Sequence, residues 1–282
     1  MTDSSPAVRA TELTKHFSIR LGLGRKTVLR ALDFEWKRGA SYGLVGPNGS
    51  GKSTLQRILA GAERPSSGEL QVLGGSLGSS QVRARIGFVP EDSPFPGELT
   101  PTAVLDLVGS LQGMDRRSVL ERSGRLLELV GLAEHAKKPL RSYSRGMLRR
   151  FALAQAWLHE PDLILLDEPT AGLDGQGFEV LAELLEEARE RGTTIVFASH
   201  LMTDLVEHCT EVFVLLQGRF AAKGSPSELF AREGCWRIDA AQLDEAQALA
   251  IGEWIRENGG EVERITPGGK SLFDLYREQR TD

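Results

Sequence analysis

The sequence predicts an α/β fold built on a parallel sheet, and three observations support this prediction. Residues 41–55 have the order of a strand, a glycine-rich loop and a helix start. Leu163-Ile-Leu-Leu166 is apolar throughout, as strands buried on both faces of a parallel sheet are. A helical segment at about 178–191 then leads to a second strand, Thr194–Ala198, so helices and strands alternate in the manner of α/β proteins.

The glycine-rich loop matches the P-loop pattern G-x-x-x-x-G-K-S at Gly46, Gly51, Lys52 and Ser53. In this pattern backbone N–H groups point at phosphate oxygens, the lysine reaches the β- and γ-phosphates, and the serine hydroxyl binds magnesium. Gly46, Gly49 and Gly51 let the backbone approach an anion closely, and the following helix adds its positive dipole end. A glycine-rich surface turn is the alternative, but the flanking strand and helix favour a nucleotide site.

Length, composition and charge limit the class of protein. The chain has 282 residues, 40% of them hydrophobic, and its net charge of −5 argues against nonspecific nucleic-acid binding. No apolar run approaches the ~18 residues of a membrane span, and residues 1–6 lack the plan of a signal peptide. We therefore expect a cytosolic protein. Its two cysteines, Cys209 and Cys235, lack metal-site spacing and are expected to be reduced thiols.

Further strands are expected on both sides of the P-loop. Short apolar or β-branched runs within residues 7–36 predict antiparallel strands before it. Residues 68–74 and 86–89 predict two more strands after it. Residues 211–216 and 219–222, joined by Gln-Gly, predict a hairpin.

The middle of the chain is expected to be helical. Thr100 caps a first helix, which has Pro101 at its first position. Its predicted buried face consists of Val104, Leu107, Val108 and Leu111. Residues 115–130 form a second helix, and Ser144 starts a third that ends near His159.

The pattern changes beyond Ser225, which predicts a separate small α/β extension. We expect helices at 226–232, 243–257 and from Ser271, and strands at 236–239 and 261–265. The predicted domains are therefore residues 1–230 and the extension 231–282.

Residues that hydrolysis requires follow the P-loop in the chain. A phosphoryl-transfer site needs a metal anchor, a group that activates water and a sensor of the γ-phosphate. Asp167 ends an apolar strand and would meet the magnesium held by Ser53, and Glu168 would polarise the attacking water. His200, at the end of the next strand, would donate a hydrogen bond to the γ-phosphate. Solvated strand-end carboxylates and a capping histidine are the alternatives at these positions.

These residues resemble the nucleotide-binding subunits of ATP-binding-cassette (ABC) transporters over about residues 8–230. In chain order the matching motifs are Phe17, which resembles the aromatic residue that stacks on adenine; the Walker A residues Gly46, Pro47, Asn48, Gly49, Ser50, Gly51, Lys52, Ser53 and Thr54; the Q-loop at Ile86–Glu91; the signature at Tyr143–Met147, with Ser144 and Gly146; the Walker B pair Asp167 and Glu168; the D-loop Ala171–Asp174; and the switch histidine His200.

The resemblance implies a two-lobed fold: a RecA-type P-loop core with an antiparallel β subdomain, and a helical subdomain at about 92–150. It implies ATP and Mg²⁺ as cofactors, and a homodimer or paralogue heterodimer in which each ATP lies between Walker A of one subunit and Ser144–Gly146 of the other. Glu91 replaces the usual glutamine and would add a carboxylate near the metal. Arg145 and Met147 replace the usual glycine and glutamine of the signature.

These departures resemble the branch that drives type-2 exporters, as does the C-terminal segment Gly269–Leu275. The resemblance therefore implies an ATPase motor on the cytoplasmic face of the membrane, with separate membrane-spanning permease subunits. A soluble ABC ATPase acting on ribosomes or DNA is the alternative, and an inactive nucleotide-binding subunit is a third. Phe95 is predicted to anchor the membrane partner, or else to pack within the helical subdomain's own core.

Overall fold

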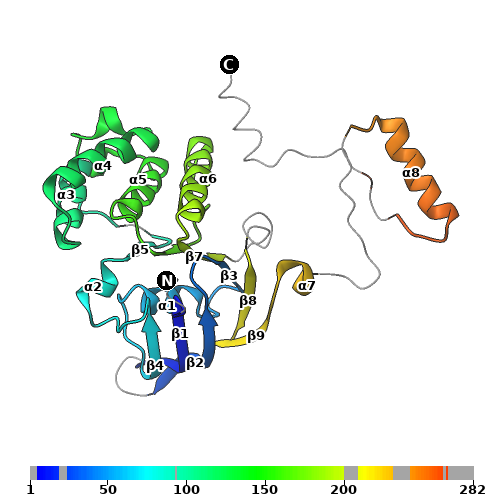
Figure 1. The fold of residues 1–282 in the computed structure, drawn as a ribbon, viewed down its shortest axis with the longest axis horizontal. Coiled ribbons are helices and arrows are strands. Elements are labelled where there is room, and N and C mark those ends of the chain that lie inside the picture. Colours follow the sequence, from blue (N-terminus) through cyan, green and yellow to red (C-terminus); the bar gives the residue numbers. More distant parts are fainter. Residues whose placement is uncertain are drawn as a thin grey trace. The chain divides into compact units, whose positions relative to one another are not determined.

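The computed structural model describes residues 5–18, 24–92, 94–199, 209–230, 242–262 and 265. The chain divides into two compact units, Met1–Phe230 and Ala231–Asp282. None of the helices in the described residues is long and apolar enough to cross a membrane. In the first unit, Figure 1 shows helices α3 to α6 grouped on one side of the central strands, with β1, β2 and β4 on the other side.

The first unit is organised around a six-stranded sheet with the order β5-β6-β7-β3-β8-β9. Its strands are β3 (Ser41–Val45), β5 (Ile86–Val89), β6 (Leu163–Asp167), β7 (Thr194–Ser199), β8 (Glu211–Leu216) and β9 (Arg219–Gly224). All neighbours pair in parallel except β8 and β9, which form the predicted hairpin. The carboxyl ends of β5, β6, β7 and β3 therefore meet at one edge, where α/β proteins place their ligands.

Strand β6 is apolar at every position before Asp167 because the sheet has a hydrophobic core on each face. Leu163 and Leu165 pack into the core shared with α1 and the smaller sheet. Ile164 and Leu166 pack into the core shared with the helical group. Successive side chains of a strand point to opposite faces, so burial on both faces leaves no position for a polar residue until the strand ends.

The antiparallel strands predicted before the P-loop are present. Strands β1 (Val8–Ser18), β2 (Arg25–Trp36) and β4 (Ser67–Val72) form a sheet of order β2-β1-β4. This sheet covers α1 (Lys52–Leu59), and Trp36 stacks on Tyr42 with ring centroids 5.1 Å apart. Between β4 and β5 the chain forms the short helix α2 (Ser80–Arg83).

Four helices form the group on the other side of the main sheet: α3 (Pro101–Leu111), α4 (Arg116–Leu129), α5 (Arg145–Trp157) and α6 (Gly175–Glu190). Two 3₁₀ turns, Ala133–His135 and Leu140–Ser142, join α4 to α5. Each of the four helices begins at a side-chain cap. The capping residues are Thr100, Asp115, Ser144 and Asp174, and each accepts a hydrogen bond from the backbone N–H three residues later.

The predicted buried face of α3 is wrong in part. Val104 is buried as expected, but Leu107 and Leu111 are 52% and 76% exposed, and Leu105 is fully buried instead. The helix is turned so that Gly109 faces α4, and a Cβ atom there would overlap the side chain of Val119. Close approach at a glycine decided which face is buried, and the apolar pattern alone did not show it.

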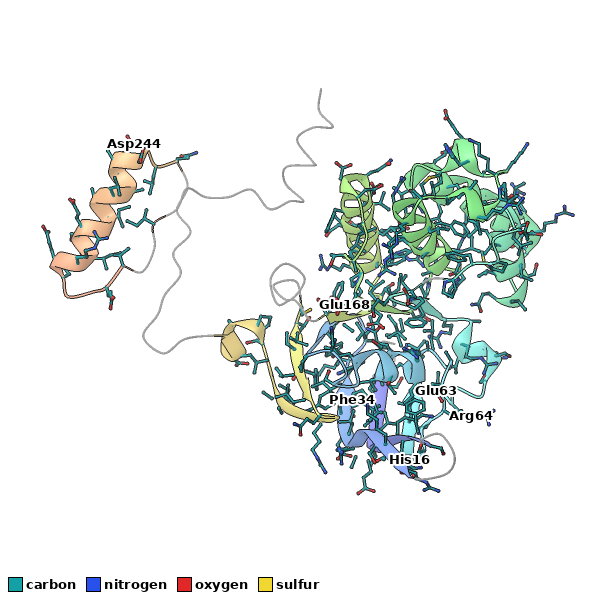
Figure 2. The ribbon with its side chains drawn as sticks, turned by 180° about the vertical axis from the view of Figure 1, so that it is seen from behind. His16, Phe34, Glu63, Arg64, Glu168 and Asp244 are labelled. Atoms are coloured by element: carbon teal, nitrogen blue, oxygen red, sulfur yellow. The ribbon has the colours of Figure 1, made fainter. Side chains whose placement is uncertain are left out.

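Helix α7 (Pro226–Phe230) ends the first unit, and the described part of the second unit contains helix α8 (Glu245–Glu257). Asp244 and Gln247 form a capping box at the start of α8, where Figure 2 labels Asp244. Residues 261, 262 and 265 were expected in a strand and are not in one. The strand expected at 236–239 and the helix expected from Ser271 lie outside the described residues.

Candidate functional site

The P-loop follows β3, which lies in the middle of the main sheet between β7 and β8. It wraps around the side chain of Lys52, which is 6% exposed. The Lys52 ammonium donates hydrogen bonds to the carbonyl oxygens of Gly46, at 2.7 Å, and Pro47, at 3.4 Å. Burial lowers the pKa of Lys52, and the carboxylates of Glu168 and Asp167 act in the opposite direction.

Two glycines of the loop are required by close packing. A Cβ atom at Gly46 would overlap the carbonyl oxygen of Leu215. Gly51 has a φ of 115°, and a Cβ atom there would lie 2.7 Å from the side chain of Leu29. Gly51 is also the N-cap of α1, which has no side-chain cap. The N-cap side chain therefore does not occupy the first N–H groups of α1, which leaves them for an anion at this helix N-terminus.

Asp167 ends β6 and faces the start of α1. Burial raises the pKa of its carboxyl group, and the neighbouring Ser53 side chain acts in the opposite direction. The Asp167 side chain is 2% exposed, and its Oδ1 atom has no hydrogen-bond partner among the described residues. Mg²⁺ prefers oxygen ligands and is usually held by one or two protein groups beside phosphate. A buried carboxylate oxygen with spare capacity next to a hydroxyl fits that ion.

Glu168 is held in a left-handed backbone conformation, with a φ of 47°. Its N–H donates to the carbonyl oxygen of Ala198 at 2.9 Å, and its Oε2 accepts a hydrogen bond from the Ser199 hydroxyl at 3.2 Å. Figure 2 shows Glu168 between the helical group and the strands. Left-handed backbone costs energy for a residue other than glycine, and such strain clusters at functional sites.

Three buried groups of the site were not found by sequence reasoning. Ser199 orients Glu168 from the end of β7. Gln56 of α1 donates to the carbonyl oxygens of Leu166 and Val196, so it ties α1 to β6 and β7. Arg149 of α5 donates to backbone carbonyls after β5 and β6. Gln56 and Arg149 stand beside apolar residues in their helices, which was the signal available for these two. The sequence does not show their hydrogen-bond partners.

The signature and D-loop residues lie together. Ser144 is exposed and caps α5, and a Cβ atom at Gly146 would lie 2.9 Å from the Asp174 carboxylate. Asp174 caps α6 and pairs with Arg150 at 3.3 Å. Among the described residues, Ser144 and Asp174 make no hydrogen bond to the P-loop. Their assignment to a nucleotide site stays a prediction.

Phe17 and Glu91 are less closely tied to this centre. Phe17 is 39% exposed, and the Lys15 ammonium lies 4.7 Å from its ring centroid, a cation–π distance. The Lys15 ammonium also bonds Glu63 and the Arg64 carbonyl, both labelled in Figure 2.

Glu91 is exposed, and the described residues contain no group of three His, Cys, Asp or Glu side chains that could hold a metal ion. Its role as a metal ligand therefore stays a prediction. His200 lies outside the described residues.

Phe95 packs within the helical group. Its ring lies 4.8 Å from that of Phe151, which is fully buried, and Phe95 itself is partly buried. This packing matches the alternative expectation, in which Phe95 belongs to the core of the helical subdomain. Cys209 is a buried thiol, and burial raises its pKa to about 12.

The fold and this centre define a class, the P-loop ATP-binding proteins. The family described as "ABC transporter" matches residues 29–171. An uncharacterized ABC transporter ATP-binding protein of Synechocystis is 34% identical over 96% of this chain and 72% of its own length. The Nod factor export ATP-binding protein I of Ralstonia nicotianae is 34% identical over 97% of this chain and 84% of its own. The chain belongs to the ABC transporter ATP-binding family, and it is an ATPase.

Solved structures agree with this assignment. An ATP-binding subunit of an ABC transporter superposes with a TM-score of 0.72 at 27% identity, and covers 79% of this chain and 91% of that one. A dimeric ATP-binding cassette bound to ADP and phosphate has the same fold, with a TM-score of 0.70 at 24% identity over 78% of this chain and 98% of that one. The predicted family, P-loop fold and ATPase activity are confirmed.

Proposed function

We propose that this chain is the motor subunit of an exporter, and that it works as a dimer on separate membrane-spanning subunits at the cytoplasmic face of the membrane. The names of several relatives support export. Besides the Nod factor protein, they include the linearmycin resistance protein LnrL of Bacillus subtilis, 34% identical over 83% of this chain, and the daunorubicin resistance protein DrrA3 of Streptomyces coeruleorubidus, 36% identical over 80%. Because these cargoes differ, we assign cargo selection to the membrane subunits.

The observation that carries the hydrolytic part of this proposal is the arrangement of Asp167 and Glu168 after β6. Ser53 and Asp167 would hold Mg²⁺ through a hydroxyl and a neighbouring carboxylate. When bound there, the ion neutralises charge on the β- and γ-phosphates. Lys52 reaches the same phosphates from the P-loop.

Glu168 orients the attacking water and accepts its proton. Two features support this role over that of a further metal ligand. Its Oε2 is directed by the Ser199 hydroxyl, and its backbone is fixed in the left-handed region at the end of the strand. A general base acts efficiently only when it is held in position toward the proton that it takes.

The positions of the two helix starts support a dimer. The N-terminus of α1 serves the phosphates from within the subunit, and that of α5, at exposed Ser144, remains available. A second helix N-terminus adds positive dipole to an anion site. We propose that Ser144, Gly146 and Asp174 serve the ATP bound to the partner subunit.

The proposed base is tested by Glu168→Gln, which keeps the shape of the side chain and removes its basicity. The variant is expected to bind MgATP, to hydrolyse it at least ~100-fold more slowly and to accumulate a dimer. Glu186→Gln, on an exposed carboxylate of α6, is the matched control and should leave turnover unchanged. Normal turnover by Glu168→Gln would place the base elsewhere, with Glu91 the first candidate.

A further inference from the structure

Arg149 is a buried arginine whose guanidinium donates hydrogen bonds to four backbone carbonyl groups. Nη1 bonds the carbonyl oxygens of Pro90 and of Glu91, the latter at 3.1 Å. Nη2 bonds those of Asp167 at 2.9 Å and Glu168 at 2.6 Å. The guanidinium is a planar fork with donors in fixed directions. These four bonds therefore define the separation between the segment at the end of β5 and the segment at the end of β6.

The position of Arg149 follows from where the main sheet ends. Strands β5 and β6 pair in parallel, and their last paired residues are Val89 and Leu166. The carbonyl groups of the next two residues of each chain segment lie beyond the pairing of β5 with β6. These are the four groups to which Arg149 donates hydrogen bonds. Buried carbonyl groups are rarely left unpaired, so the guanidinium helps to hold both loops in this geometry, together with the Ala171 N–H, which donates to the Glu168 carbonyl at 3.0 Å.

Several hydrogen bonds hold Glu168, and Arg149 supplies one that comes from the helical group. The N–H of Glu168 bonds β7, and its carboxylate bonds Ser199, also on β7. Its carbonyl oxygen accepts hydrogen bonds from Arg149 of α5, the helix that begins at Ser144, and from the N–H of Ala171 at 3.0 Å. A residue at a φ of 47° needs such restraints to stay there.

We infer that Arg149 is a positioning residue for ATP hydrolysis, which holds the backbone of Glu168 and of the loop at Glu91 and ties both to the helix that starts at Ser144. This inference rests on the proposed role of Glu168 as the base. Arg149 makes no hydrogen bond to the P-loop among the described residues, so nucleotide affinity should depend little on it. A movement of the α5 helix would be passed directly to the base and to the loop after β5.

The kinetic test compares Arg149→Met and Arg149→Lys in the full-length protein. Arg149→Met should lower kcat by roughly 10–100-fold, because a base displaced by about 1 Å loses that much rate. KM and the affinity for a fluorescent ATP analogue should stay within about threefold. Arg149→Lys should recover part of kcat, because an ammonium keeps the charge but lacks the fork.

A stability control separates positioning from folding. Leu126→Ala removes a buried side chain of α4, and it should lower the unfolding temperature without lowering kcat. A loss of kcat in Leu126→Ala equal to that in the Arg149 variants, at an equal drop in unfolding temperature, would overturn the inference. If neither Arg149 variant folds, Arg149 is a structural residue only, which also overturns it.

A double-mutant cycle tests whether Arg149 acts through Glu168. In a Glu168→Gln background, Arg149→Lys should lower the residual single-turnover rate by less than about threefold, because the group that it positions is already lost. An equal fold loss in both backgrounds would show that Arg149 acts independently and would reject the inference alone. Normal turnover by Glu168→Gln itself would instead reject the proposed base, and the inference with it.

Discussion

Lys52 shows at the scale of a single residue how this site is prepared for an anion. Its ammonium is buried inside the P-loop, where it bonds backbone carbonyls, and burial lowers its pKa. The carboxylates of Asp167 and Glu168 oppose that shift. A bound phosphate would favour the charged form of the lysine in the same way, since an opposite charge close by stabilises an ammonium.

Lys52→Ala is therefore expected to weaken ATP binding by about 100-fold or more, because it removes the main charged contact to the β- and γ-phosphates. Titration with a fluorescent ATP analogue measures the effect. Lys37→Ala, at an exposed lysine between β2 and β3, is the control and should bind normally. An unchanged affinity in Lys52→Ala would remove this residue from its assigned role.

At the scale of elements, the packing of α3 on α4 depends on Gly109. The glycine lets Val119 approach the α3 backbone, and this contact turns Leu107 and Leu111 toward solvent. The exposed leucines are thus a consequence of the way in which two helices fit together. Helix propensity alone would favour alanine at this position.

Gly109→Ala is expected to destabilise the protein by about 1–3 kcal/mol, since the added methyl group overlaps Val119 and overpacking outweighs the gain in helix propensity. Denaturant unfolding measures this change. Gly124→Ala is a matched control on α4, where an added Cβ atom meets nothing within 4 Å, and it should stabilise by about 0.5–1 kcal/mol. If Gly109→Ala stabilises the protein as Gly124→Ala does, the close approach is not a packing constraint.

At the scale of the whole molecule, the question is whether one subunit completes the ATP site of another. Within the subunit, Ser144 caps α5 and is exposed, and Gly146 lies against Asp174. The solved ATP-binding cassette with the same fold is itself dimeric. If two subunits share each site, subunits with different inactivating changes should restore activity when mixed. Sites contained within single subunits would not.

Mixing Lys52→Ala subunits with Ser144→Arg subunits should restore ATPase activity that neither has alone. In the mixed dimer one site carries both changes and the other carries neither. The measurement is ATP hydrolysis against mixing ratio, with dimer formation verified by differently tagged subunits. Asp115→Arg, which removes the equivalent cap of α4, controls for loss of a helix cap and should not abolish activity by itself. Proven mixed dimers without recovered activity would count against a shared site.

The parts of the site that the sequence predicted are local in the chain. Gly46, Lys52 and Ser53 lie within one loop, and Asp167 and Glu168 are adjacent at the end of one apolar strand. Their chemistry follows from residue types at fixed spacing on a strand–loop–helix unit, so the pattern is visible before any folding is considered. The P-loop fold and the ATPase class were predictable for the same reason.

The tertiary structure alone decided which other residues support that chemistry. Arg149 and Pro90 are 59 residues apart in the chain, and Gln56 and Leu166 are 110 apart, yet each pair is hydrogen-bonded. The buried face of α3 likewise depended on the approach of α4 at Gly109. Sequence periodicity records how a segment relates to its own axis, whereas these contacts depend on where distant segments meet, which only the packed fold determines.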